Sequence, residues 1–300
     1  MRSNGVLHRV WTRRLSALRK HWRAATEGDV RAVHQARVAS RRLRESLPIV
    51  GLTLPPDELL AVRKAVRRVT RALGPVREAD VSMRLLDDIG RAQAPLLPAV
   101  AATRRRVEEA RAMRGRLMLD ELGHSAGVKI IKRLDGVRQY PDPPAAQWRL
   151  VLAERTRLRG IDLRDAVDEA GILYEPERLH QIRIAAKKLR YSLELAGETR
   201  AASTRRFVNE LKGLQDHLGH LHDLQVVSAY AAGVPPDESL ASGVDRLARH
   251  LDDTCHDLHA KFLAGRMRLL GLTDVVLEKI VPRIASHGGG EASRVTTLIA

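Results

Sequence analysis

The stretch Val33–Leu47, VHQARVASRRLRESL, has a basic side and an apolar side when it is wound as an α-helix. At about 100° per residue, the basic side falls within an arc of about 80° and consists of His34, Arg37, Arg41 and Arg44. The neighbouring side is made of valine, alanine and leucine. This pattern predicts a helix that buries one face in a core and presents a row of cations on the other.

The same pattern returns in Leu179–Leu193, LHQIRIAAKKLRYSL. Its basic side repeats the first one position for position, 146 residues later, as His180, Arg183, Lys187 and Arg190. A basic helix that occurs twice, with its histidine and its apolar face kept, suggests two walls of one anion-binding site.

Composition favours an all-α protein. Hydrophobic residues make up 44% of the 300 residues but aromatic residues only 3%, and the abundant Leu, Ala and Arg are strong helix formers. No run of about 18 apolar residues predicts a membrane span, and the charged N-terminus lacks the apolar core of a signal peptide. The single cysteine, Cys255, excludes an internal disulfide framework and fits a cytoplasmic location.

The net charge of +16 lies in the first half of the chain. Residues 1–150 hold 31 Lys/Arg against 15 Asp/Glu, whereas residues 151–300 hold 21 of each. Such an excess indicates a partner with many negative charges: a phosphate polymer, nucleic acid or an anionic surface.

Apolar spacing and turn residues predict helices that repeat in order along the chain. The expected ranges are 6–26, 30–50, 57–89 with a kink at Gly74-Pro75, 95–122, 146–170, 177–197, 203–231 and 239–270. A connector with one short helix is expected over 123–144, and a short helix and flexible tail over 272–300.

These helices predict two copies of a four-helix unit, because two separate motifs recur at an offset of 145–146 residues. The units would span 6–122 and 145–271, within a single domain of residues 1–290. The predicted fold is all-α: a tandem pair of four-helix bundles, related by a pseudo-twofold axis, with a basic groove between them.

Two duplicated motifs resemble the CHAD family (conserved histidine α-helical domain). The first is the pair of basic helices just described; the second is Leu73-Gly74-x-x-Arg77-Glu78-x-Asp80 with its weaker copy Leu218-Gly219-x-x-His222-Asp223-x-Gln225. The resemblance covers roughly residues 6–270. It implies two similar helical bundles that bind inorganic polyphosphate in a basic groove between them.

Many family members are fused to a triphosphate-hydrolysing CYTH domain, which has no counterpart in this sequence, so a stand-alone member is expected. Its function is expected to be non-catalytic binding of polyphosphate, with no cofactor and no metal. Polyphosphate granules or a polyphosphate-metabolising enzyme would be further partners, and the location would be cytoplasmic or on granules.

The residues expected to contact phosphate are the two basic rows, His34, Arg37, Arg41, Arg44, His180, Arg183, Lys187 and Arg190. Arginine supplies charge and a planar fork of donors, and spacings of three and four residues make a ladder that follows successive phosphates. Flanking contacts are expected from Arg42, Lys64, Arg67, Arg71, Lys188 and Lys212. The charged residues of the second motif are interpreted as interhelical ion pairs rather than as ligand contacts.

Two other functions remain open at this point. A metal-dependent polyphosphate or triphosphate hydrolase would need several carboxylates around a metal, and the basic rows have only Glu45 and Glu194 nearby. Nucleic-acid binding fits the charge, but no aromatic residue that could stack on bases is interleaved among the arginines of the rows. His217, His220 and His222 resemble a metal cluster, although helical spacing turns His222 away from the other two.

Overall fold

Helices form nearly all of the chain in the computed structural model, which describes residues 5–235 and 238–286. Over those residues there is no β-strand, so the all-α prediction is confirmed. None of the helices in the described ranges is long and apolar enough to cross a membrane. The predicted flexible tail falls mostly on residues 287–300, outside the described residues.

The first half of the chain contains α1 to α5. Their bounds are Val6–Thr26 for α1, Val30–Val50 for α2, Pro56–Ala92 for α3, Leu97–Leu122 for α4 and His124–Gly136 for α5. Short 3₁₀ turns follow α2 and α5 and precede α4. The short helix expected in the connector is therefore present as α5, and it begins directly after α4.

The second half contains α6 to α10. Their bounds are Ala145–Ala170 for α6, Pro176–Glu198 for α7, Arg205–Ala232 for α8, Glu238–Val275 for α9 and Val281–Ala285 for α10, with a π-helical turn over Val276–Ile280. The expected helix ranges agree with these bounds to within a few residues, except that α9 is longer.

Local sequence signals explain where the two basic helices begin. The carboxylate of Asp29 accepts a hydrogen bond of 2.7 Å from the backbone N–H of Ala32, which caps α2. Pro176 lies in the first turn of α7, followed by the acidic Glu177, and both suit a helix N-terminus.

Helix α3 runs through Gly74-Pro75 without interruption, as one helix of 37 residues. A proline inside a helix removes one N–H donor and leaves the carbonyl four residues earlier, here that of Arg71, without its helical partner. Both Pro75 and Arg71 are exposed, so water can satisfy that carbonyl. The buried neighbours Leu73 and Val76 hold the helix in the core on its other side.

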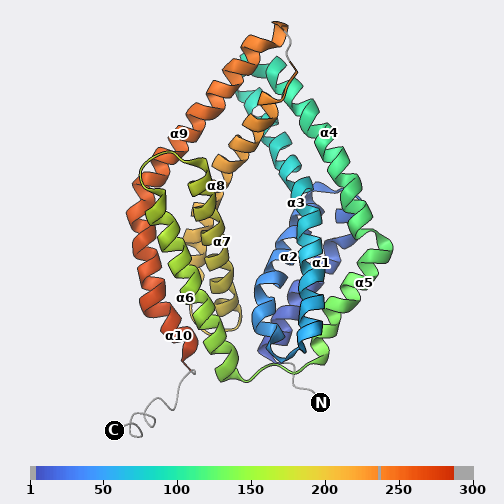
Figure 1. Cartoon of the computed structure of the whole chain (residues 1–300), viewed down its shortest axis with the longest axis vertical. Helices are drawn as coiled ribbons and strands as arrows, with labels where there is room; N and C mark the ends of the chain where they lie inside the picture. The colour runs from blue at the N-terminus through green and yellow to red at the C-terminus, as the bar shows by residue number, and fades with distance from the viewer. Residues whose placement is uncertain (1–4, 236–237, 287–300) are drawn as a thin grey trace.

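The helices pack in chain order within each half, and the two halves meet through matching helices. Helices α1 to α4 pack in sequence, as do α6 to α9, while α2 contacts α7, α3 contacts α8 and α4 contacts α9. Figure 1 shows the two halves as two arms that join where α3, α4, α8 and α9 come together, with α2 and α7 facing each other between the arms. The order of packing suits the predicted duplication, whereas the pseudo-twofold axis stays a prediction.

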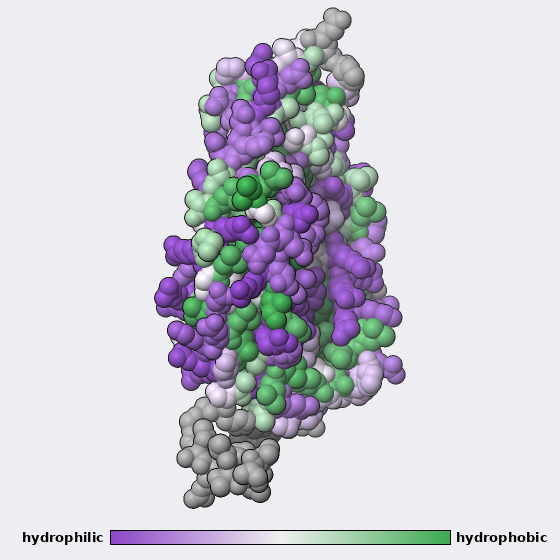
Figure 2. Space-filling view, turned by 60° about the vertical axis from the view of Figure 1, so that its left-hand side comes forward, coloured by the Kyte–Doolittle hydropathy of each residue, from purple (hydrophilic) through white to green (hydrophobic). Residues whose placement is uncertain are grey.

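The apolar faces of the two basic helices lie in the core. On α2 the buried side chains include Val33, Leu43 and Leu47, and on α7 they include Leu179 and Leu189. Each fully buried leucine contributes roughly 1.5–3 kcal/mol, and truncating Leu43 to alanine is expected to cost about 2–5 kcal/mol. Burial of one face leaves the opposite, basic face to line the space between the arms. On the outside, Figure 2 shows mainly hydrophilic side chains with small separate hydrophobic patches.

Candidate functional site: a cation-lined cavity between the two halves

A cavity of about 430 Å³ lies between the two halves of the molecule. Four helices line it: α2 and α3 from the first half, α7 and α8 from the second. Its volume falls within the range of roughly 300–1,000 Å³ that is usual for ligand-binding pockets.

The two basic rows meet in this cavity. Six of the eight residues predicted to contact phosphate line it, namely His34, Arg37 and Arg41 from α2 and Arg183, Lys187 and Arg190 from α7. His180 does not line the cavity, but the centroid of its ring lies 4.7 Å from that of His222, and His222 is a lining residue. Arg44 lies outside the cavity and pairs with Glu45 at 3.6 Å.

The flanking residues predicted from the sequence also lie outside the cavity. Arg42 donates a hydrogen bond of 3.0 Å from its Nε to Glu194 of α7. Lys64, Arg67 and Arg71 line a different hollow, between α3 and α4. Lys188 is half-buried and Lys212 is exposed, and neither reaches the cavity.

Arg37 and Arg183 each lie over a glycine of the next helix. A Cβ atom at Gly74 of α3 would be only 2.6 Å from Nη1 of Arg37, and the same guanidinium donates a hydrogen bond of 3.3 Å to the carbonyl of Thr70. In the second half, the nearest atom to a Cβ at Gly219 of α8 would be Nε of Arg183, at 3.7 Å. The glycine of the first Leu-Gly step therefore makes room for Arg37, whereas a Cβ at Gly219 would be at an ordinary contact distance from Arg183.

The cavity crowds cations together away from water. Burial, and then the charges of Arg183, Arg41 and Arg37, lower the pKa of Lys187 to about 6. Burial and the neighbouring Arg41 lower the pKa of Arg37 to about 10. Because like charges and desolvation both oppose the charged forms, an anion placed among these groups would relieve an existing electrostatic strain.

The histidines of the cavity are held in their neutral forms. Burial, followed by the charge of Arg183, lowers the pKa of His180 and brings that of His222 to about 4. Burial and the charge of Arg77 lower the pKa of His34. A neutral imidazole still offers one N–H donor, so these residues can donate hydrogen bonds to a ligand without being protonated.

Two buried side-chain nitrogens of α7 have no hydrogen-bond partner among the described residues. They are Nε of Arg183 and Nδ1 of His180. A buried polar group without a partner costs about 1–3 kcal/mol, and a guanidinium more. Both atoms belong to the basic row on α7, and of these two residues Arg183 lines the cavity.

Arg190 is fixed in place by three neighbours. Its Nε donates a hydrogen bond of 2.8 Å to Gln215, its Nη1 pairs with Glu194, and its guanidinium lies 4.6 Å from the ring centroid of Tyr191. Gln215 is itself held by a hydrogen bond of 3.0 Å to the carbonyl of Ala186. A cation held in this way loses little conformational entropy when it binds a ligand.

The charged residues of the second motif divide between two roles. Glu78 pairs with Arg114 at 3.2 Å and Asp80 with Arg111 at 2.7 Å, so these two make the interhelical ion pairs predicted from the sequence. Arg77, His222 and Asp223 instead line the cavity, and Glu78 both lines the cavity and makes its ion pair. Burial raises the pKa of Asp223 to about 6, although Arg183 and Arg77 oppose the shift.

Sequence reasoning missed several lining residues, including Arg77, Tyr191, Gln215, His220, His222 and Asp223. A signal for some of them was present, because the second motif recurs at almost the same offset as the basic rows. Motifs that are duplicated together can meet at one site. No group of three or more His, Cys, Asp and Glu side chains suited to a metal ion occurs within the described part of the chain.

A protein-family model described as the CHAD domain matches residues 9–232. The chain belongs to the CHAD family. CHAD domains are associated with the binding of polyphosphate and triphosphate. Among curated proteins, none matches the chain by sequence.

Two solved structures share the fold of this CHAD protein. The crystal structure of the CHAD domain from the plant Ricinus communis is 19% identical, with a TM-score of 0.58 over 93% of this chain and 90% of that one. PptA from Streptomyces chartreusis is 18% identical, with a TM-score of 0.61 over 89% of this chain and 97% of that one. At these identities the likeness establishes the fold alone.

Proposed function

We propose that this CHAD protein binds inorganic polyphosphate in the central cavity and does not hydrolyse it. The observation that carries the proposal is the meeting of two basic rows, from α2 and α7, in one cavity of about 430 Å³. Polyphosphate presents closely spaced negative oxygens and no apolar surface. Guanidinium groups match it, because each supplies both charge and several donors.

The electrostatics of the cavity support an anionic ligand. Its cations outnumber its carboxylates, and Lys187 has a strongly lowered pKa because Arg183, Arg41 and Arg37 surround it. A bound phosphate chain would reverse that shift and would also supply acceptors for the unpartnered Nε of Arg183. Binding should weaken as the salt concentration rises. The cationic side chains of the protein displace salt counterions from the polyanion, and the release of these ions is less favourable at high salt.

The carboxylates of the cavity favour binding over hydrolysis. Metal-dependent phosphoryl transfer uses several ionised carboxylates to hold the metal. Glu78 is engaged with Arg114, and Asp223 has its pKa raised to about 6. Glu78 therefore already has a cationic partner and Asp223 ionises less readily than usual, which leaves the exposed Asp216 as the remaining carboxylate that lines the cavity.

The test is a titration of the protein with polyphosphate by isothermal calorimetry. The variant Arg37→Gln/Arg183→Gln removes one cation from each wall without reversing any buried charge, and its affinity is expected to fall by at least about tenfold. The control Arg246→Glu/Arg249→Glu changes two exposed arginines of α9, far from the lining residues, and should bind normally.

Three results would overturn the proposal. The first is unchanged affinity in a folded Arg37→Gln/Arg183→Gln variant, with folding checked by circular dichroism. The second is release of phosphate from polyphosphate in the presence of Mg²⁺ or Mn²⁺. The third is displacement of polyphosphate by nucleic acid at physiological salt.

A further inference from the structure

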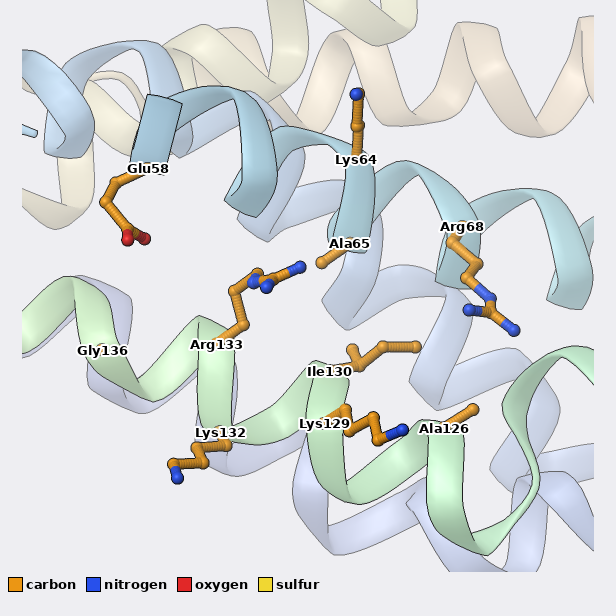
Figure 3. A pocket seen from close by; sticks show the side chains of 10 residues that line it. All are labelled: Glu58, Lys64, Ala65, Arg68, Ala126, Lys129, Ile130, Lys132, Arg133 and Gly136. Atoms are coloured by element: carbon orange, nitrogen blue, oxygen red, sulfur yellow. The ribbon is translucent and has the colours of Figure 1, made fainter. Parts of the chain in front are cut away.

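A second basic surface lies on the outer side of the first half, in a groove between α3 on one side and α4 and α5 on the other. Two hollows of about 620 and 490 Å³ form it, and they are continuous because Lys64 and Arg68 line both. Figure 3 shows Ala65 and Arg68 of α3 facing Ile130 and Arg133 of α5 across one of the two hollows. We call this surface the lateral groove.

The lateral groove is separate from the central cavity. The two sites adjoin at one ion pair, because Glu78 of the cavity pairs at 3.2 Å with Arg114 of the groove. The two sites share no lining residue.

The rims of the lateral groove carry cations that are free of ion pairs. Lys64, Arg67 and Arg71 on α3 and Lys129, Lys132 and Arg133 on α5 are all exposed and make no ion pair within residues 5–235 and 238–286. Arg68, by contrast, pairs with Glu121 of α4 at 2.6 Å. These six unpaired cations outnumber the carboxylate of Glu58, which also lines the groove without an ion pair in the described part of the chain, so the groove keeps a net positive potential.

Between the rims the surface is apolar. Pro75 and Leu117 are its exposed apolar residues, and the buried side chains of Ala65, Ile130 and Met118 lie at the floor of the two hollows. Leu117 exposes 57% of its surface although it lies beside buried Met118. A large apolar side chain left exposed between charged rims is a feature of surfaces that bind another protein.

From these features we infer that the lateral groove docks an acidic amphipathic helix of a partner protein. The apolar face of such a helix would lie over Leu117, Pro75 and Ile130, while carboxylates on its two flanks would meet the lysines and arginines of the rims. The groove follows α3 from Glu58 to Pro75, about 25 Å, which matches a partner helix of about 17 residues. A phosphate polymer would use the rims alone, because it has no surface that gains from burying Leu117.

The probe is a synthetic peptide of about 18 residues, with leucines along one helical face and glutamates on both flanks. A second peptide of the same composition, scrambled to remove the amphipathic pattern, is the matched control. Binding is followed by fluorescence anisotropy, and helix formation by circular dichroism. The patterned peptide should bind at least about tenfold more tightly than the scrambled one and should gain helix on binding.

Three variants locate the contact. Lys64→Glu/Lys129→Glu reverses one exposed cation on each rim and should lower the affinity for the patterned peptide about tenfold or more. Leu117→Ser should lower the affinity for the patterned peptide severalfold without changing any charge. Arg246→Glu/Arg249→Glu, which makes the same change of charge on exposed residues of α9, should bind the peptide normally.

The inference is wrong if the scrambled peptide binds as well as the patterned one, since charge alone would then explain binding. It is also wrong if Leu117→Ser has no effect on binding of the peptide. A Lys64→Glu/Lys129→Glu variant that no longer binds polyphosphate but still binds the peptide normally would contradict it too. Polyphosphate binding to the central cavity is measured in the same variants. Loss of the peptide with polyphosphate retained separates this surface from the proposed function.

Discussion

Lys187 carries much of the electrostatic strain of the central cavity. Its pKa of about 6 results from burial and from three arginines, Arg183, Arg41 and Arg37, with a smaller contribution from Arg190. At pH 7 and without an anion beside it, most Lys187 side chains are therefore uncharged. An anion bound beside them favours the charged form and raises the pKa again.

Binding of polyphosphate is therefore expected to take up a proton. At pH 8, Lys187 and Asp223 (each with a pKa of about 6) and His222 (with a pKa of about 4) are all deprotonated. Lys187 is expected to be the main group that accepts a proton, because burial and its arginine neighbours lower its pKa the furthest from the ordinary value, which is 10.5. As the pH rises above about 6, the concentration of free protons falls, and binding that requires the uptake of a proton becomes less favourable. The affinity for polyphosphate should therefore fall. Calorimetry in buffers with different ionisation enthalpies measures the uptake directly.

Lys187→Arg is the control for this prediction, because a guanidinium stays charged at pH 8. The variant should bind polyphosphate with little proton uptake and a flatter pH dependence. Equal uptake in the variant and the natural protein would show that Lys187 is not the group that titrates.

At the scale of helices, the distance between α2 and α3 depends on a residue without a side chain. Gly74 lets the guanidinium of Arg37 pass against the backbone of α3, where a Cβ would stand 2.6 Å from Nη1. The corresponding approach of Arg183 to Gly219 is looser, at 3.7 Å, which is an ordinary van der Waals contact. The two glycines of the duplicated motif therefore differ in what they tolerate.

Gly74→Ala and Gly219→Ala make a matched pair. Alanine is the better helix former by about 1 kcal/mol in each case. At Gly74 the new methyl group must displace Arg37, so polyphosphate affinity should fall severalfold. At Gly219 it fits, so affinity should stay the same and the melting temperature should not fall. Titration and thermal unfolding of both variants check this, and equal affinities would contradict it.

For the whole molecule, charged pairs between the two halves hold the walls of the cavity together. Arg42 of α2 pairs with Glu194 of α7, and the buried Arg14 of α1 pairs with Glu198 of α7. Glu194 also pairs with Arg190, which lines the cavity. The carboxylate of Glu194 therefore serves both the contact between the two halves and the positioning of Arg190 in the cavity.

Glu194→Gln removes that shared charge with little change of shape. Arg42 and Arg190 then lose their common counter-charge in a partly buried place, so we expect a loss of about 1–3 kcal/mol in the free energy of unfolding. Polyphosphate should recover stability more strongly than in the natural protein, because Arg190 is released to bind it. Thermal unfolding with and without polyphosphate measures both effects.

Glu154→Gln provides the comparison for Glu194→Gln, since the pair of Glu154 with Arg157 lies on the exposed surface of α6. This variant should melt as the natural protein does, with and without polyphosphate. A Glu194→Gln variant that also melts normally would mean that the pairing of Glu194 contributes nothing to holding the halves together.

Helix periodicity in the sequence was enough to predict the all-α fold and the approximate helix bounds. These depend on short-range spacing, because residues three and four apart share a helix face whatever the helix packs against. The core faces around Leu43 and Leu189 follow from this rule alone, whereas the meeting of the two rows was predicted from their duplication.

Which cations face the cavity was decided only by the tertiary structure. Lys64, Arg67 and Arg71 resemble the row on α2 in the sequence, yet the side of α3 that packs against α2 turns them outward into the lateral groove. Arg77 and Asp223 resemble residues of simple ion pairs, yet they line the cavity. The physical reason is that periodicity defines the faces of a helix, whereas its neighbours determine which face meets the core, the ligand site or solvent.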